Sequence, residues 1–269
     1  MNRMQEKIRL DVLLTERGLV ESRSLAQRMV MAGQVRVAGQ VVLKPATKVP
    51  ADAEVTVDHG PKFVSRGGEK LEGGLLAFGL TELSGRICAD VGASTGGFTD
   101  CLLQYGARKV YSIDVGYGEL HWKLRNDPRV EVMERTNARF VQQLPEPVSL
   151  VVVDASFISL KIFFPVIPGW FGEAGGEGVM LIKPQFEAGR SDVSRGDGVI
   201  RDARIHRQVL LDVLTAAGEH GFGLAGLIRS PLLGPKGNAE FLVHLRYPAG
   251  APQDDAGLVD AVAPEEGPD

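Results

Sequence analysis

Four charged residues stand beside strongly apolar segments and are the first candidates for a catalytic centre. They are Lys70, Asp154, Lys183 and Glu240. Asp154 and Lys183 each end an apolar run typical of a buried strand, and Glu240 begins another. In an open parallel sheet the carboxyl ends of the strands share one edge, where charged residues face the ligand crevice. One such residue is commonly a structural ion pair, but two lysines with two carboxylates predict a network with perturbed proton affinities.

A second feature is a glycine-rich loop after the first predicted strand of the same region. It contains Asp90, Gly92, Ala93, Ser94, Thr95, Gly96, Gly97 and Phe98. Its glycines allow a tight turn and a close approach of the backbone to a ligand. Asp114 follows Gly92 by 22 residues, at the end of the next predicted strand, where a carboxylate suits a ribose diol.

Three nucleotide-type ligands compete for this loop. No Walker-type lysine follows the glycines, and their spacing differs from that of a dinucleotide loop. S-adenosylmethionine has no pyrophosphate and carries a sulfonium cation, so the acidic Asp90 before the loop favours this cofactor. A glycine turn that serves only close packing is the structural alternative.

The elements that must position these residues alternate between strand and helix. This alternation predicts an α/β fold with a mainly parallel sheet and an antiparallel last strand. Two helices are predicted, at 97–105 and 201–217, and a third segment, 160–171, is helical with interruptions at its prolines. The predicted strands are 87–91, 109–114, 130–133, 150–154, 178–183, 222–230 and 240–247.

The first 60 residues predict a separate small α+β domain. Leu10, Leu13 and Leu14 recur at helical spacing, Ser22 suits the N-cap of a second helix, and a glycine turn at Gly39 indicates a hairpin. Residues 1–50 carry nine Lys/Arg and four Asp/Glu, a net charge of +5, which suits an anionic partner. A solvated basic helix face is the alternative.

The remaining segments are interpreted as a linker at 61–68, a second domain over 69–247 and a disordered tail over 248–269. The tail has six acidic residues, no basic ones and many Pro, Ala and Gly residues. It can therefore bury too little apolar surface to offset the entropy lost on ordering.

Several motifs together resemble a known family. The run RLDVLLTERGLVESRSLAQRMVMAGQVRVAGQVV is similar to an S4-type RNA-binding domain, and DVGASTGGFTD resembles the cofactor motif of FtsJ-like methyltransferases. With KFVSRGGEKL, ERTNAR, VVVDASFISL, LIKPQFEAGR and GNAEFL in order, residues 7–247 resemble the TlyA family of hemolysin A-like rRNA methyltransferases.

The resemblance implies a Rossmann-like class I methyltransferase that uses S-adenosylmethionine to methylate a ribose 2′-hydroxyl of ribosomal RNA, with cytidine as the target. It implies that the four charged residues form a Lys-Asp-Lys-Glu tetrad, with Lys183 at the hydroxyl, and that Asn137 lies near the adenine. As an amine Lys183 would accept the hydroxyl proton; as an ammonium it would orient a lone pair. The expected RNA contacts are Arg9, Arg17, Arg23, Arg28, Arg36, Lys44, Arg66 and Phe186. The partners expected are ribosomal RNA or ribosomal subunits, with no metal and no membrane.

Other classes of protein fit less well. The absence of a long apolar run and of a signal segment predicts a cytoplasmic protein, and two cysteines exclude a disulfide scaffold. A base-amine methyltransferase would carry an Asn-Pro-Pro-aromatic turn where this chain has Asp154-Ala-Ser-Phe157. Three alternatives stay open: an RNA-binding protein with an inactive methyltransferase domain, an enzyme with a transfer RNA substrate, and a pore-forming hemolysin. The glycine-rich segment 186–202 is interpreted as a substrate-facing loop.

Overall fold

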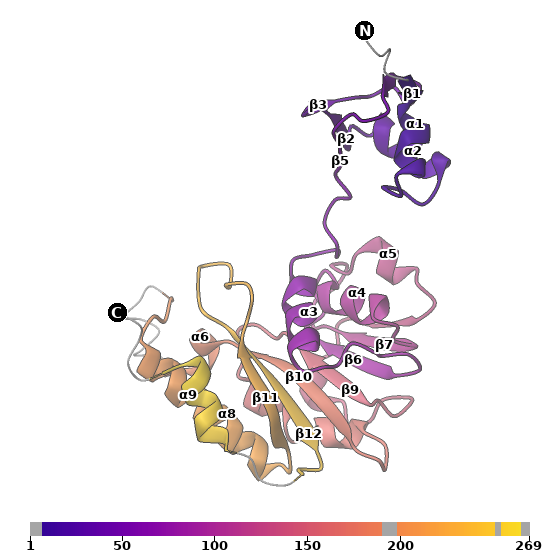
Figure 1. Ribbon diagram of the computed structural model, residues 1–269. Helices are drawn as coiled ribbons and strands as arrows, with labels where there is room; N and C mark the ends of the chain where they lie inside the picture. Colours follow the sequence, from indigo (N-terminus) through magenta and orange to yellow (C-terminus); the bar gives the residue numbers. More distant parts are fainter. Residues whose placement is uncertain (1–6, 190–197, 251–253, 265–269) are drawn as a thin grey trace. The chain divides into compact units, whose positions relative to one another are not determined.

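The computed structural model describes residues 7–189, 198–250 and 254–264, and the chain divides into two compact units, Met1–Lys62 and Phe63–Asp269 (Figure 1). The first is called the N-terminal unit and the second the C-terminal unit. None of the helices in the described ranges is long and apolar enough to cross a membrane.

The N-terminal unit contains the two helices and the small strands that the sequence predicts. The side chain of Ser22 accepts a hydrogen bond from Leu25 N and so caps the second helix, as expected. One face of each helix is buried against the strands. The helices are α1 (Leu10–Glu16) and α2 (Arg23–Met31), and the strands are β1 (Lys7–Arg9), β2 (Val35–Val37), β3 (Gln40–Val41), β4 (Lys48–Pro50) and β5 (Val55–Val57).

A seven-stranded sheet forms the centre of the C-terminal unit, in the order β11-β12-β10-β9-β6-β7-β8. Strand β12 pairs antiparallel with both of its neighbours, and the remaining pairs are parallel, which confirms the predicted topology. The strands are β6 (Ile87–Val91), β7 (Lys109–Ile113), β8 (Val130–Met133), β9 (Leu150–Val153), β10 (Gly176–Ile182), β11 (Gly223–Arg229) and β12 (Phe241–Tyr247).

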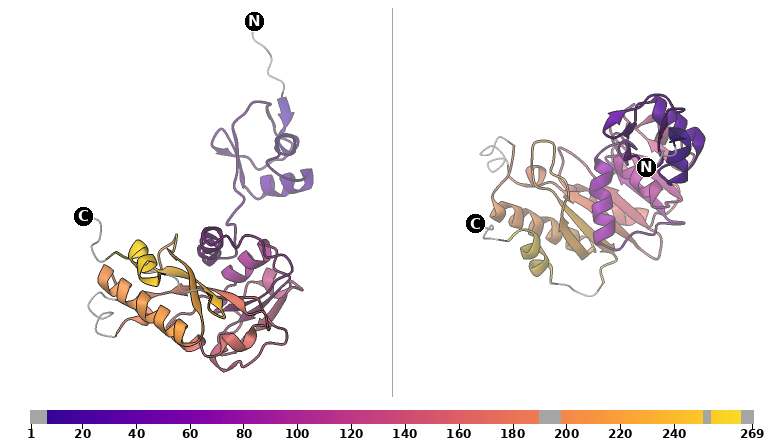
Figure 2. Two further views of the ribbon diagram at one scale, coloured as in Figure 1. Left: turned by 60° about the horizontal axis from the view of Figure 1, so that its bottom comes forward. Right: turned by 45° about the horizontal axis from the view of Figure 1, so that its top comes forward.

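Helices cover both faces of this sheet, which explains why its central strands are apolar without alternation. Leu150 and Val152 of β9 face one cluster, whereas Val151 and Val153 face the other. The first face is covered by α3 (Gly67–Ala77), α4 (Gly97–Gln104) and α5 (Trp122–Arg125). The second face is covered by α8 (Ala203–Glu219), α9 (Asp255–Val262) and the short turns η2 (Leu160–Phe163) and η3 (Ile167–Trp170) (Figure 2).

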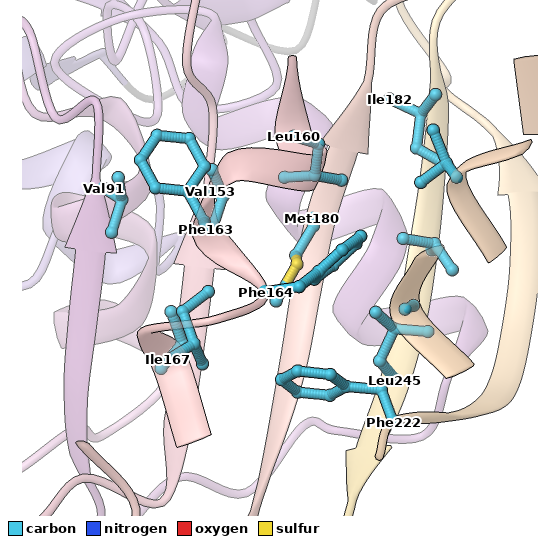
Figure 3. Close-up of a cluster of buried hydrophobic side chains, with 14 of the residues drawn as sticks. Val91, Val153, Leu160, Phe163, Phe164, Ile167, Met180, Ile182, Phe222 and Leu245 are labelled. Atoms are coloured by element: carbon cyan, nitrogen blue, oxygen red, sulfur yellow. The ribbon is translucent and has the colours of Figure 1, made fainter. Parts of the chain in front are cut away.

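The second cluster holds the largest apolar side chains of the unit. Figure 3 shows Phe164 beside Met180 of β10, with Phe222 and Leu245 close by. Phe164 is fully buried, and its ring centroid lies 5.6 Å from that of Phe222. This packing fixes the central strands and therefore the residues at their ends.

Two predicted boundaries are wrong. The linker was expected to reach residue 68, but Phe63 is buried in the first cluster and α3 already begins at Gly67. The reason is close packing: a Cβ atom on Gly97 at the start of α4 would lie 2.9 Å from the backbone nitrogen of Gly68.

The tail was expected to be disordered, but its described residues 254–264 contain α9. Val259 is fully buried, and Asp260 accepts a 2.7 Å hydrogen bond from Arg207 of α8. Overall composition concealed this helix because its few apolar residues share one face. Residues 251–253 and 265–269 lie outside the described ranges.

Candidate active site

The four predicted catalytic residues meet as two ion pairs at the carboxyl edge of the sheet. Lys183 Nζ lies 2.6 Å from Asp154 Oδ1, and Lys70 Nζ lies 2.5 Å from Glu240 Oε2. The strand register explains the meeting, because Ile182 at the end of β10 is opposite Phe241 at the start of β12. Asp154 follows the neighbouring strand β9, and Lys70 comes from α3.

Both pairs are largely shielded from solvent. The side chains of Lys70 and Glu240 are 6% and 1% exposed, and those of Lys183 and Asp154 are 8% and 22% exposed. Isolated charges at such depth are costly, so the pairing of each lysine with a carboxylate is required for their burial. The tetrad carries no net charge.

All four residues line one cavity of about 460 Å³, a size suited to a small organic ligand. The same cavity is lined by Gly92, Ala93, Ser94, Thr95, Gly97 and Phe98 of the glycine loop. The predicted loop and the predicted tetrad are therefore parts of a single site in the C-terminal unit.

The glycines of the loop are needed for its shape. A Cβ atom on Gly92 would lie 2.9 Å from the carbonyl oxygen of Asp154, and the φ of Gly92 is +81°. Gly96 has a φ of +94° and would meet the side chains of Leu120 and Leu124. The backbone thus approaches the end of β9 closely and leaves room for a ligand beside it.

Asp90 precedes the glycine loop and supports it from the protein interior. It is fully buried, does not line the cavity, and its Oδ2 accepts a 2.6 Å hydrogen bond from Thr99 Oγ1. Its Oδ1 has no hydrogen-bond partner among the described residues. Burial raises the pKa of the Asp90 carboxyl to about 7, with a smaller contribution from the charge of Asp154.

Asp114 lies beside the cavity, in a small recess that shares Ala93 and Ser94 with it. Its two oxygens accept hydrogen bonds from the backbone nitrogens of Ser94 at 2.8 Å and Gly116 at 2.7 Å. Ser94 Oγ donates to Glu119 Oε2 at 3.1 Å, so a second carboxylate joins the recess. Asn137 is not among the residues that line either space, and it caps η1 (Ala138–Phe140) through a hydrogen bond from Arg139 N.

Three of the basic residues predicted to contact RNA have structural partners in the N-terminal unit. Arg9 and Arg23 both donate to Asp11, which is fully buried at the start of α1. The hydrogen bond from Arg9 is the main reason that the pKa of Asp11 lies far below its usual range. Arg17 donates to the carbonyl oxygens of Ala51 and Ala53.

The other predicted RNA contacts lie at the surface of the N-terminal unit or on the wall of the cavity. Arg28, Arg36 and Lys44 are exposed in the N-terminal unit, and no ion pair involves them within the described residues. Arg66 and Phe186 belong to the C-terminal unit, and both line the cavity. The predicted loop 186–202 falls partly outside the described residues, at 190–197.

Among the cavity-lining residues that sequence reasoning missed, four have side chains suited to a role in the site. Ser156 Oγ accepts a 2.9 Å hydrogen bond from Lys183 Nζ, and Phe157, which is 90% exposed, lies 5.1 Å from the ring of Phe186. The Oε1 of Gln185 is buried without a partner among the described residues. The fourth is Lys236. They all occupy loops or a single turn, where no periodicity marks them.

A mainly parallel sheet with an antiparallel strand, a glycine loop after β6 and a charged rim defines a Rossmann-like methyltransferase domain. Comparison with known sequences agrees. Residues 63–247 match the FtsJ-like methyltransferase family, and residues 8–55 match the S4 domain. The chain belongs to the TlyA group of FtsJ-like methyltransferases, as the following relatives show.

The chain is 45% identical to the 16S/23S rRNA (cytidine-2′-O)-methyltransferase TlyA of Mycobacterium tuberculosis, over 98% of this chain and 100% of that protein. It is 44% identical to a Brachyspira hyodysenteriae protein called Hemolysin A, over 88% of this chain and 99% of that one. A solved structure of a candidate hemolysin from Streptococcus thermophilus has 41% identity and a TM-score of 0.70, with 97% of each chain covered.

Proposed function

We propose that this protein transfers a methyl group from S-adenosylmethionine to a ribose 2′-hydroxyl of ribosomal RNA. The observation that carries the proposal is the arrangement of the tetrad and the glycine loop on the wall of one cavity. The names of the relatives support rRNA as the substrate and cytidine as the target nucleotide.

The residues of the loop fit the cofactor. Gly92 and its neighbours leave backbone exposed to the cavity, and Asp114 with Glu119 offers carboxylates beside Ser94 for a ribose diol. Asp154 brings a negative charge to the same wall, which suits a cationic ligand. From the family resemblance alone, we propose that Asn137 lies near the adenine of the cofactor. When bound, S-adenosylmethionine supplies a methyl group that its positive sulfur activates.

Lys183 is the residue proposed to act on the hydroxyl. Asp154 and Ser156 hold its Nζ from two sides, so that the nitrogen has a fixed position at the cavity wall. As an amine it accepts the proton that the 2′-hydroxyl loses; as an ammonium it orients the oxygen lone pair. Lys70 and Glu240 hold the adjacent wall together. Holding the hydroxyl in line with the methyl–sulfur bond contributes on the order of several kcal/mol.

RNA binding is proposed to begin at the N-terminal unit. Arg28, Arg36 and Lys44 are its exposed cations, and such residues bind phosphates without reading sequence. Arg9 and Arg23 still expose 41% and 53% of their side chains, so they can add charge while bound to Asp11. Phe186 is proposed to stack on the target base beside the cavity.

The decisive experiment is methyl transfer from radiolabelled S-adenosylmethionine to separated 30S subunits, 50S subunits and bulk transfer RNA, followed by nucleoside analysis. Label in a 2′-O-methylated nucleoside of rRNA is the expected result. Label on a base or only in transfer RNA contradicts the proposal. Cofactor binding without any transfer indicates an RNA-binding protein, and leakage from liposomes indicates the activity that the name hemolysin implies.

A further inference from the structure

The charges that line the cavity do not balance. They comprise the cations Arg66, Lys70, Lys183 and Lys236 and the carboxylates Asp154 and Glu240, which gives four minus two, a net of +2. Because the tetrad is internally neutral, the excess belongs to Arg66 and Lys236. Both are exposed, and neither forms an ion pair within the described ranges.

One buried ion pair links the two segments that carry the excess cations. Arg66 is the N-cap of α3, one turn before Lys70, and Lys236 stands four residues before Glu240. The Lys70–Glu240 pair joins α3 to the start of β12. It therefore ties together the two segments that carry Arg66 and Lys236, and both of these residues line the cavity.

The turn that carries Lys236 is itself well anchored. Gly237 N donates to the carbonyl of Gly234 at 2.9 Å, which closes the turn. The side chain of Asn238 is buried and donates to Gly198 O at 2.9 Å while accepting from Ile200 N at 3.0 Å. Lys236 is thus an exposed residue on a turn that hydrogen bonds hold in place.

We infer that Lys236, together with Arg66, binds the phosphates that flank the target ribose. The inference rests on the proposed function, because a ribose inside an RNA chain has a phosphodiester on either side. Lysine suits this task as a compact point charge, and contacts to phosphate position the chain without selecting a base. The other cations that line the cavity, Lys70 and Lys183, each have a carboxylate partner in the described part of the chain.

The test is the salt dependence of binding. Wild-type protein and the Lys236→Ala variant are titrated with deproteinised rRNA by filter binding between 50 and 200 mM KCl. Loss of one contact to single-stranded RNA lowers the slope of log K against log salt by about 0.7. Across this range the variant should therefore lose about threefold less affinity than the wild type.

Three controls make the outcome specific. Lys236→Arg keeps the charge and should keep the slope, whereas Lys236→Gln keeps the approximate length and should behave like the alanine variant. Arg108→Ala removes an exposed charge at the amino end of β7, whereas the cavity lies at the carboxyl ends of the strands, and should leave the slope unchanged. Calorimetric titration should give one affinity for S-adenosylmethionine in all variants.

An unchanged slope for Lys236→Ala, in protein that still methylates rRNA, overturns the phosphate contact and leaves the proposed function intact. Absence of methyl transfer by the wild type to every rRNA tested overturns the proposed function instead. A weaker affinity for S-adenosylmethionine in Lys236→Ala also contradicts the inference, because it would assign Lys236 to the cofactor.

Discussion

Lys183 Nζ lies 2.6 Å from Asp154 Oδ1, and this contact joins the ends of the adjacent strands β10 and β9. The same nitrogen donates to Ser156 Oγ at 2.9 Å. Strand pairing alone brings the two backbones together, but these two partners determine where the nitrogen points. A proton acceptor needs such a fixed position before its chemistry matters.

The first prediction concerns this nitrogen. Lys183→Ala should reduce the rate of methyl transfer at saturating substrates by about 10²–10⁴, the usual contribution of a positioned acid or base. Ser156→Ala removes only one of the two partners of Nζ, so its loss should be smaller, on the order of tenfold. Single-turnover assays with labelled cofactor measure both rates.

The lower rates of the two variants should not result from a general loss of folding. Calorimetry should detect cofactor binding by both, because neither side chain belongs to the glycine loop. A Lys183→Ala enzyme with wild-type turnover contradicts the proposed role of the residue.

The second prediction concerns the buried pair of Lys70 and Glu240. Lys70→Met leaves a buried carboxylate unpaired and should lower the free energy of unfolding by about 3–5 kcal/mol. Combining it with Glu240→Leu removes the second charge and should restore most of that stability, without restoring methyl transfer. Urea unfolding and the methyl-transfer assay provide the two readouts. Equal stability of the single and double variants would show that the pair contributes no buried charge coupling.

The sheet, and the meeting of charged residues at its carboxyl edge, could be predicted because both leave strong local signals. Asp154 and Lys183 are charged residues that abruptly end runs of apolar residues, and alternation of such runs with helices defines the topology. The predicted strands 87–91 and 130–133 match β6 and β8 residue for residue.

The features that could not be predicted from the sequence depend on contacts between segments that are distant along the chain. Nothing local distinguishes Arg17, whose side chain binds the backbone of residues 51 and 53, from Arg36, whose side chain forms no hydrogen bond or ion pair with a described residue. The buried Asp11 reads as an ordinary first-turn acid, although it organises Arg9 and Arg23. The helix α9 could not be predicted from the acidic composition of the tail. Composition averages over all residues of a segment and does not show that the apolar ones share one helix face.

The third prediction separates structural from RNA-binding arginines. Arg17→Ala should lower the stability of the N-terminal unit by about 1 kcal/mol, because two carbonyl oxygens lose a charged donor. Arg36→Ala should leave stability unchanged and lower the salt slope of RNA binding by about 0.7. Thermal unfolding and filter binding of the full chain measure the two effects. The reverse pattern would mean that Arg17 contacts RNA and Arg36 does not.

The last prediction uses the buried Asp90. Its pKa of about 7 in the folded protein lies above the value of 3.8 for an unperturbed aspartate, so the folded state retains a proton that the unfolded state releases. The contribution of Asp90 to stability is therefore fully present below about pH 4 and is lost as the pH rises towards 7, at about 1.4 kcal/mol per pH unit. Above pH 7 the loss is complete and the dependence ends.

Asp90→Asn removes this titration while it keeps the shape and an acceptor for Thr99 Oγ1. The difference in unfolding free energy between wild type and variant should therefore change steadily from pH 4 to 7 and become constant above pH 7. Urea titrations at pH 4.5, 6.0, 7.5 and 8.5 provide the measurement. A difference that is the same at all four values would mean that Asp90 is ionised throughout, with a partner for Oδ1 that lowers its pKa.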